Sequence, residues 1–342
     1  MKRAGNLIEK IADPENLRLA FWKARKGKEQ KEEVKAFRKN LEGNLVILRQ
    51  QILSGKVDVG NYHYFTIYDP KERVICAASF QERVLHHALM NICHQVFENF
   101  QIYDSYATRK NKGTYAALHR AETFQKKYAW FLKLDIRKYF DSINHTVLKD
   151  LLRRRFKDEK LLLIFDTIID SYETKEGMGI PIGNLTSQYF ANYYLAYADR
   201  YLKEDLKIPA FVRYMDDMVL WSNDKSVLLE ARRLIANFLK IRLSLQLKIS
   251  FLNRSNQGLS FIGYRIFDNY TKLNQRSKQR FKRKMSQYYT QLKTGMWSEE
   301  EYQRHIIPLI AFTQHASAYQ LRELVIKNIG SATNVHHHLL KK

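Results

Sequence analysis

The sequence is poor in cysteine, proline and glycine. Cys76 and Cys93 are the two cysteines among 342 residues, too few for a disulfide framework or a cysteine zinc site and in keeping with a reducing cytoplasm. Five prolines and 13 glycines leave few obvious linkers, so we expect subdomains that share a core rather than separate domains.

Long hydrophobic runs are also missing. No stretch approaches the roughly 18 consecutive apolar residues that a membrane span needs. The start, Met1 to Asn6, lacks the apolar core of a signal peptide. We therefore expect a cytoplasmic protein without a membrane-spanning segment.

Acidic residues are outnumbered by basic ones. The 58 Lys and Arg residues face 35 Asp and Glu residues, which leaves a formal net charge of +23. Such an excess opposes compaction unless a polyanion is nearby, and nucleic acid is the commonest such partner, with a membrane surface as the competing one. The 21 Tyr and 19 Phe residues indicate a globular chain rather than a disordered one.

The first part of the chain is predicted to be helical with one pair of strands. Residues 6–55 carry a helical pattern. Residues 62–78 are typical of two strands around a turn at Asp69-Pro70, and a helix is expected over 80–100.

The middle of the chain predicts a sheet. A nearly continuous apolar run over 129–136 is typical of a buried strand, and residues 210–222 indicate an apolar strand, an acidic turn and a second apolar strand. The other expected elements are helices over 146–156, 160–171, 185–205 and 226–241, and short strands over 243–250 and 259–267. The order β-α-β-β-α-β is that of a split ferredoxin-like sheet.

Acidic residues stand at the ends of these strands. Asp135 ends one buried strand, and Asp216 and Asp217 lie at the turn between two others. Paired Asp residues are common in plain turns, but the flanking apolar strands and the partner strand that ends in Asp135 favour a shared site. Three converging carboxylates suit Mg²⁺, and two such ions would activate an attacking hydroxyl and neutralise a leaving oxygen.

Residues 272–293 are basic without any acidic residue, and aromatic side chains are interleaved among the charges. A solvated helix normally carries both signs, so this composition favours contact with backbone phosphates. The basic residues are Lys272, Arg276, Lys278, Arg280, Lys282, Arg283, Lys284 and Lys293. The segment after 295 is expected to be helical.

Motifs in these segments resemble those of reverse transcriptases. Tyr214-Met215-Asp216-Asp217 resembles their YxDD box, and Lys133 to Phe140 resembles their first carboxylate motif. Residues 65–89 and 104–119 are similar to their two fingers motifs, and Gly258 to Tyr264 to their primer-grip hairpin. All the motifs occur in family order and cover about residues 60 to 317.

The motif between the carboxylate strands narrows this resemblance. Most reverse transcriptases have Gln-Gly there, whereas this chain has Ile182-Gly183, followed by Ser187-Gln188. That pattern resembles the reverse transcriptases of diversity-generating retroelements, which copy a template-repeat RNA with frequent errors opposite adenine. The alternatives are a group II intron-, retron- or defence-type reverse transcriptase of ordinary fidelity, and a non-catalytic RNA-binding scaffold that kept a polymerase fold.

The resemblance implies roles around the carboxylates. Asp135, Asp216 and Asp217, with the carbonyl of Ile136, are the expected ligands of two Mg²⁺ ions, for which Mn²⁺ can substitute. The residues expected to contact the incoming deoxynucleoside triphosphate are Lys71, Arg73, Phe140, Ile182 and Gly183. Among these, Lys71 and Arg73 would clasp the triphosphate and Phe140 would exclude a ribose 2′-hydroxyl; the other interpretations are surface charge and a core Phe.

Template and primer contacts are also implied. The residues concerned are Arg109, Gly263, Tyr264, Arg280, Lys282, Arg283 and Lys284. Lys248 is either a proton donor to pyrophosphate or a solvent-facing lysine. The run His336–His338 lacks a convincing ligand pattern, so no zinc is expected.

The implied architecture is a mixed α/β (α+β) right hand. It has α-rich fingers over residues 1–128 with part of 146–180, a ferredoxin-like palm over 129–267 with the carboxylates, and a basic helical thumb over 268–342. We expect no maturase extension, endonuclease or RNase H domain after the thumb. The implied partners are template RNA, cDNA and a small basic accessory protein that forms a pentameric helical bundle.

Overall fold

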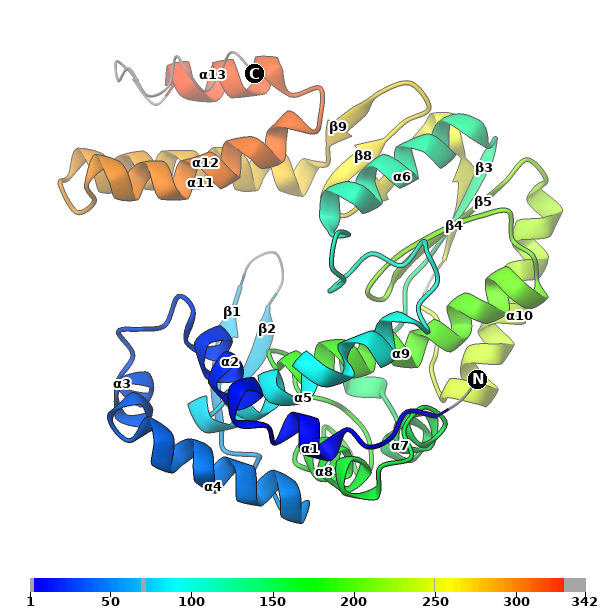
Figure 1. Cartoon of the computed structure of the whole chain (residues 1–342). Helices are drawn as coiled ribbons and strands as arrows, with labels where there is room; N and C mark the ends of the chain where they lie inside the picture. Colours follow the sequence, from blue (N-terminus) through cyan, green and yellow to red (C-terminus); the bar gives the residue numbers. More distant parts are fainter. Residues whose placement is uncertain (1–2, 69–71, 249, 329–342) are drawn as a thin grey trace.

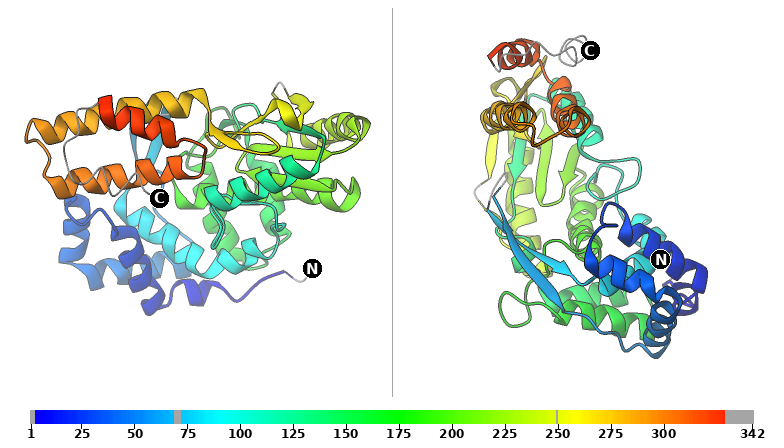
Figure 2. Two further views of the ribbon diagram at one scale, coloured as in Figure 1. Left: turned by 90° about the horizontal axis from the view of Figure 1, so that it is seen from above. Right: turned by 90° about the vertical axis from the view of Figure 1, so that its left-hand side faces the viewer.

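The computed structural model describes residues 3–68, 72–248 and 250–328. Its ribbon is C-shaped, with an N-terminal helical arm and a C-terminal helical arm on the same side of a central sheet (Figure 1). Seen from above, the two arms overlie each other beside the sheet (Figure 2). None of the helices in these ranges is long and apolar enough to cross a membrane.

The N-terminal arm is built from helices around a small aromatic core. Its helices are α1 (Ile8–Ile11), α2 (Pro14–Arg25), α3 (Glu32–Lys39), α4 (Leu41–Ser54) and α5 (Phe80–Glu98). Helix α2 starts at Pro14 because Asp13 caps it, its side chain accepting hydrogen bonds from the amides of Glu15 and Asn16. Phe21 lies in the core, where its ring packs against those of Phe37 and Phe80.

A β-hairpin projects from this arm. Strands β1 (Tyr62–Ile67) and β2 (Arg73–Ala78) are antiparallel, with Tyr62 opposite Ala78, as the alternating pattern predicted. The expected turn at Asp69-Pro70 lies outside the described residues.

The central sheet contains strands β3 (Trp130–Leu134), β4 (Ala210–Tyr214), β5 (Asp217–Ser222) and β6 (Phe251–Arg254) in the order β4-β5-β3-β6, with antiparallel neighbours. Helices α6 (Thr114–Lys127), α9 (Leu185–Arg200) and α10 (Lys225–Leu243) pack against its faces. Helices α7 (His145–Arg153) and α8 (Glu159–Asp170) pack against α9. The strand order and the crossovers confirm the predicted ferredoxin-like sheet.

Both faces of this sheet are buried, which explains the continuous apolar runs. Phe131 and Trp221 pack on the face that carries α6, whereas Leu132 and Leu220 pack into the main core with α9 and α10. Helix α6 therefore belongs to the core of the sheet, although it lies within the range 1–128 expected for the fingers.

One predicted strand is misplaced. Over 243–250 the helix α10 continues through Leu243, and Leu247 makes an isolated bridge to Ile136, while the sheet strand β6 begins later, at Phe251. The alternating leucines indicate a strand, but Leu243 is buried at the end of the helix and Leu245 is buried in an irregular segment. Tertiary packing thus overrode the local pattern.

A second sheet connects the central sheet to the C-terminal arm. Strands β7 (Leu259–Phe261), β8 (Tyr264–Ile266) and β9 (Thr271–Leu273) form it, and β9 falls in the range that the sequence assigned to the thumb. Helices α11 (Gln275–Lys293), α12 (Glu299–Gln314) and α13 (Tyr319–Asn328) follow. They enclose a separate small core that includes Phe281, Met285 and Ile306.

Candidate active site

The three predicted carboxylates lie at one end of the central sheet. Asp135 directly follows β3, and Asp217 opens β5. The antiparallel register pairs Leu134 with Met218, so the next step along it brings Asp135 opposite Asp217. Asp216 lies in the β4–β5 turn, after Met215, whose φ of 55° is in the left-handed region. The sheet therefore brings all three side chains to one place.

A buried ion pair supports this turn. Arg213 donates to both carboxylate oxygens of Asp199 at 2.7 Å, and both side chains are fully buried. The same guanidinium donates to the carbonyl of Met215 and to the side chain of Asn192, each at 3.0 Å. The sequence does not predict this network, because no local pattern pairs an Arg in a strand with an Asp on α9.

The carboxylate of Asp217 lies in an unusual environment. Burial raises its pKa to about 6, against the lowering effect of Lys133, and the charges of Asp216 and Asp135 raise it further. Its Oδ2 is 3.0 Å from Lys133 Nζ, while its buried Oδ1 has no hydrogen-bond partner among the described residues. Like charges at close quarters and an unpartnered oxygen suit a bound cation.

The carboxylates alone do not form a complete metal site. Within residues 3–68, 72–248 and 250–328, no three His, Cys, Asp or Glu side chains are close enough together to hold a metal ion. The donor set of hard oxygens nevertheless fits a hard divalent cation, and the Oδ1 of Asp217 has no hydrogen-bond partner among the described residues.

A cavity of about 760 Å³ opens in front of the carboxylates. Most residues that the sequence assigned to the metal and the nucleotide line it, namely Arg73, Asp135, Ile136, Phe140, Ile182, Gly183, Asp216 and Asp217. Gln188, Lys248 and Ile262 line it as well. Lys71, the other predicted triphosphate contact, lies outside the described residues. The volume is in the usual range for a small-molecule site.

The Ile182-Gly183 segment forms a wall of this cavity by pairing with strand β2. The amide of Cys76 donates to the carbonyl of Ile182 at 2.8 Å, and the amide of Ala78 donates to Asn184 Oδ1 at 3.2 Å. Gly183 has a φ of 127°, and a Cβ there would lie 2.9 Å from the carbonyl oxygen of Cys76. Glycine is therefore needed for so close an approach.

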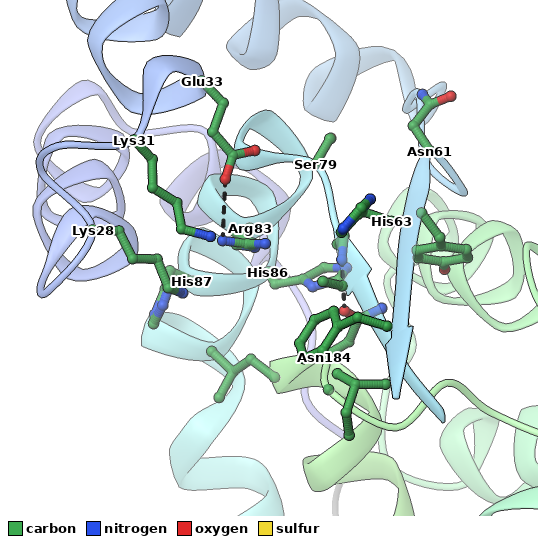
Figure 3. Close-up of a pocket in the computed structure, with 17 residues that line it drawn as sticks. Lys28, Lys31, Glu33, Asn61, His63, Ser79, Arg83, His86, His87 and Asn184 are labelled. Carbon is green, nitrogen blue, oxygen red and sulfur yellow. Dashed lines mark hydrogen bonds and ion pairs between the residues drawn. The ribbon is translucent and has the colours of Figure 1, made fainter. Parts of the chain in front are cut away.

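A second cavity, of about 640 Å³, lies behind this wall (Figure 3). It shares Gly183 with the first cavity and is lined by Lys28, Lys31 and Arg83, with Glu33 as the acidic side chain beside Arg83. Its other lining residues include His63, Phe65, His86, His87 and Asn184. The buried Asn184 Nδ2 and His86 Nε2 have no hydrogen-bond partner in the described part of the chain. Burial lowers the pKa of His87 to about 4, so His87 is neutral near pH 7.

The family follows from comparison with known proteins. The model of the family "Reverse transcriptase (RNA-dependent DNA polymerase)" matches residues 68–266, which include the carboxylates and the other residues that line their cavity. This chain belongs to the reverse transcriptase family. Expectations for its metal, nucleotide and strand contacts can therefore be compared with where each residue lies.

Relatives of this reverse transcriptase are distant. It is 23% identical over 262 residues to a putative COX1/OXI3 intron 2 protein of Saccharomyces cerevisiae, covering 57% of this chain and 30% of that one. It is 23% identical over 279 residues to protein YkfC of Escherichia coli, covering 65% and 71%. Apo telomerase from Candida tropicalis has a similar fold, with a TM-score of 0.53, 13% identity and coverage of 82% and 62%. The right-hand polymerase fold is confirmed by this likeness.

Two residues predicted to contact template or primer make internal contacts in this structure. Arg109 donates to Glu98 at 2.6 Å and to the carbonyls of Ile102 and Ser105, so its guanidinium ties a loop to α5. Tyr264 is fully buried, and its hydroxyl donates to the carbonyl of Phe312 on α12. Both side chains form internal hydrogen bonds that hold neighbouring elements together.

The other predicted contacts are on the surface or in the cavity. Arg280, Lys282 and Arg283 on α11 are exposed, because Phe281 and Met285 take the inward-facing positions. Lys248 is largely exposed, and its Nζ is 3.4 Å from Asp135 Oδ2. The run His336–His338 lies outside the described residues.

The predicted role of Phe140 in sugar selection can be tested directly. It lies half-buried on the cavity wall, five residues after Asp135. We expect Phe140→Ala to increase incorporation of ribonucleotides relative to deoxyribonucleotides by about tenfold or more, since the lost ring volume would admit a 2′-hydroxyl. Primer extension with each nucleotide set measures this, and Phe140→Tyr, which keeps the ring, should discriminate as wild type does. Equal discrimination by Phe140→Ala and wild type would make Phe140 a packing residue.

Proposed function

We propose that this protein is an RNA-directed DNA polymerase that extends a primer along an RNA template. The observation that carries the proposal is the convergence of Asp135, Asp216 and Asp217 on a cavity that also presents Arg73 and the Ile182-Gly183 wall. A basic chain with such a cavity suits phosphoryl transfer to a growing polynucleotide.

Each wall of the cavity has its own task in this proposal. Asp135, Asp216, Asp217 and the carbonyl of Ile136 would hold two Mg²⁺ ions, which supply charge neutralisation for the phosphoryl oxygens. Arg73 would bind the triphosphate, and Phe140 would face the sugar. The cavity closes around the nucleotide on the side of Ile182 and Gly183, which keeps it aligned with the primer end.

Template and primer would follow the basic surfaces. The exposed Arg280, Lys282 and Arg283, with Lys284, would contact backbone phosphates from the thumb. The second cavity combines basic side chains with the rings of His63 and Phe65, a composition suited to single-stranded nucleic acid. Because this cavity adjoins the nucleotide wall, we assign it to the template strand on its way to the carboxylates.

The activity is tested by primer extension. A DNA primer annealed to an RNA template should be extended by deoxynucleoside triphosphates in the presence of Mg²⁺ or Mn²⁺. The same reaction with chelator added should stop, because the carboxylates then lack their cations. Binding of the template–primer without any extension under either metal would favour the RNA-binding scaffold and overturn the proposal.

The proposed subtype is the reverse transcriptase of a diversity-generating retroelement, error-prone at template adenines. Its support is Ile182, which offers the incoming nucleotide an aliphatic surface where Gln is usual in the family. A small basic accessory protein, a pentameric helical bundle, would assist it in the cytoplasm. A group II intron-type enzyme is the alternative, because one relative, 26% identical over 141 residues, is the group II intron-encoded protein LtrA of Lactococcus lactis. The proposal includes fingers over residues 1–128, a palm over 129–267 and a thumb over 268–342. Helix α6 lies within the fingers range but packs with the palm.

Ile182→Gln separates the two subtypes. A Gln at this position can pack on the nucleotide and hydrogen-bond its sugar, which favours a correctly aligned pair. One such hydrogen bond is worth about 0.5–1.5 kcal/mol, so we expect misincorporation opposite template adenine to fall several-fold while synthesis persists. Sequencing of cDNA made on a defined RNA measures it, with Ile182→Val as the control that keeps an aliphatic wall. Equal adenine error rates in wild type and Ile182→Gln would leave an enzyme of ordinary fidelity.

A further inference from the structure

Lys133 contacts both Asp217, which lines the active-site cavity, and strand β7. Its Nζ is 3.0 Å from Asp217 Oδ2 and donates to the backbone carbonyl of Ser260 at 2.7 Å. The side chain is 22% exposed, so it is packed between its partners rather than extended into solvent. One ammonium group therefore joins a catalytic carboxylate to strand β7 of the second sheet.

The strand pattern explains why Lys133 points there. Successive side chains of β3 alternate between the faces, and Leu132 and Leu134 belong to the main core. Lys133 therefore shares the opposite face with Phe131, the face against which β7 packs through Leu259 and Phe261. Lys133 pairs with Val219 in the register, so Asp217 is its diagonal neighbour on β5.

The contact with Ser260 involves the backbone, so Lys133 restrains the strand itself and not only a side chain. Two residues further on, Ile262 lines the same cavity as Asp217. Ile262 and Gly263 form the β7–β8 turn with φ values of 41° and 95°, which makes this turn tight. The position of its tip relative to the carboxylates thus depends on where β7 is held.

We propose that Lys133 is a positioning residue that holds the β7–β8 hairpin in register with Asp217, and with it the primer end that the hairpin supports. This inference rests on the proposed polymerase function. Lys133 occupies Oδ2 of Asp217 and leaves Oδ1 without a partner among the described residues, so it also sets the orientation of that carboxylate. Misplacing reacting groups by about 1 Å can cost roughly 10²-fold in rate.

The test compares Lys133→Met with a matched lysine variant. Lys225→Met also removes one positive charge. Lys225 opens helix α10, and its Nζ lies 5.3 Å from the ring of Trp130, at the end of β3 away from the carboxylates. In single-turnover incorporation on an RNA template, Lys133→Met should lower the rate about 10–100-fold, with template–primer Kd and nucleotide KM within about twofold of wild type. Lys133→Arg, which keeps a cation with several donors, should recover part of the rate, and Lys225→Met should behave as wild type.

A second measurement follows the hairpin directly. Hydrogen exchange of the amides in residues 259–266 should quicken in Lys133→Met and stay at the wild-type rate in Lys225→Met. Unchanged exchange, or a rate defect that excess Mg²⁺ removes completely, would overturn the positioning role and leave Lys133 as a charge partner of Asp217. A wild-type protein that extends no primer would instead reject the polymerase proposal, while the exchange measurement would still test the contact.

Discussion

Asp216→Asn is expected to reduce DNA synthesis on an RNA template by roughly 10³-fold or more. Asp216 lies in the turn between β4 and β5, beside Asp217 and across the sheet from Asp135. Losing one of three charges weakens the hold on the cations, whose neutralisation of phosphoryl oxygens is worth several kcal/mol, and about 1.4 kcal/mol corresponds to each tenfold in rate. Single-turnover primer extension measures the loss.

Affinity for nucleic acid should not fall in parallel. The basic surfaces that would supply most of the affinity lie on other elements, and removing a negative charge can only favour a polyanion. We therefore expect the template–primer Kd of Asp216→Asn to equal that of wild type or to be slightly lower. Asp205→Asn, which changes an exposed Asp away from the cavity, serves as the control. If Asp216→Asn kept a tenth of the wild-type activity, Asp216 would not be a ligand of the metal site.

Asp199→Ala should destabilise the protein and impair the active-site turn together. The change leaves the fully buried guanidinium of Arg213 without its carboxylate, and breaking a buried ion pair in this way costs about 3–5 kcal/mol. That is a large part of the roughly 5–15 kcal/mol by which proteins are usually stable. Urea denaturation should show the midpoint shift at an unchanged slope.

A double variant separates stability from positioning. Replacing Asp199 and Arg213 together by Leu removes both charges, so the free energy of unfolding should lie closer to wild type than in Asp199→Ala. The carbonyl of Met215 nevertheless loses the donor that Arg213 provides, so nucleotide incorporation should remain low. Recovery of stability and activity together would show that the ion pair only stabilises the fold and does not position the turn.

The part of the site that could be predicted depends on short-range patterns. Asp135, Asp216 and Asp217 were found because each adjoins an apolar strand, and strands of one sheet bring their ends together. Arg73, Phe140 and Ile182 were assigned by resemblance to a family, and the fold brings them to the same cavity. Their roles in binding remain proposals.

Contacts made in the folded chain explain where the structure departs from the local sequence pattern. Arg109 and Tyr264 have side chains suited to contact with nucleic acid. In the structure Arg109 donates to Glu98 and to two backbone carbonyls, and the Tyr264 hydroxyl donates to the carbonyl of Phe312. The leucines near residue 245 alternate as in a strand, yet a helix end buries the first of them. In each case groups of the folded chain, from the same loop or a neighbouring element, already contact the side chain.

By itself the sequence determined the excess of positive charge, most of the strand and helix types and the strand-end positions of the three carboxylates, because charge, hydrophobic period and turn residues act over a few positions. Only the tertiary structure decided which side chains support those carboxylates. Arg213 meets Asp199 on α9, and Lys133 meets both Asp217 and the Ser260 carbonyl, across 84 and 127 positions of the chain. Such pairs form because the fold brings the sheet against α9 and the β7–β8 hairpin, and no local pattern carries that information.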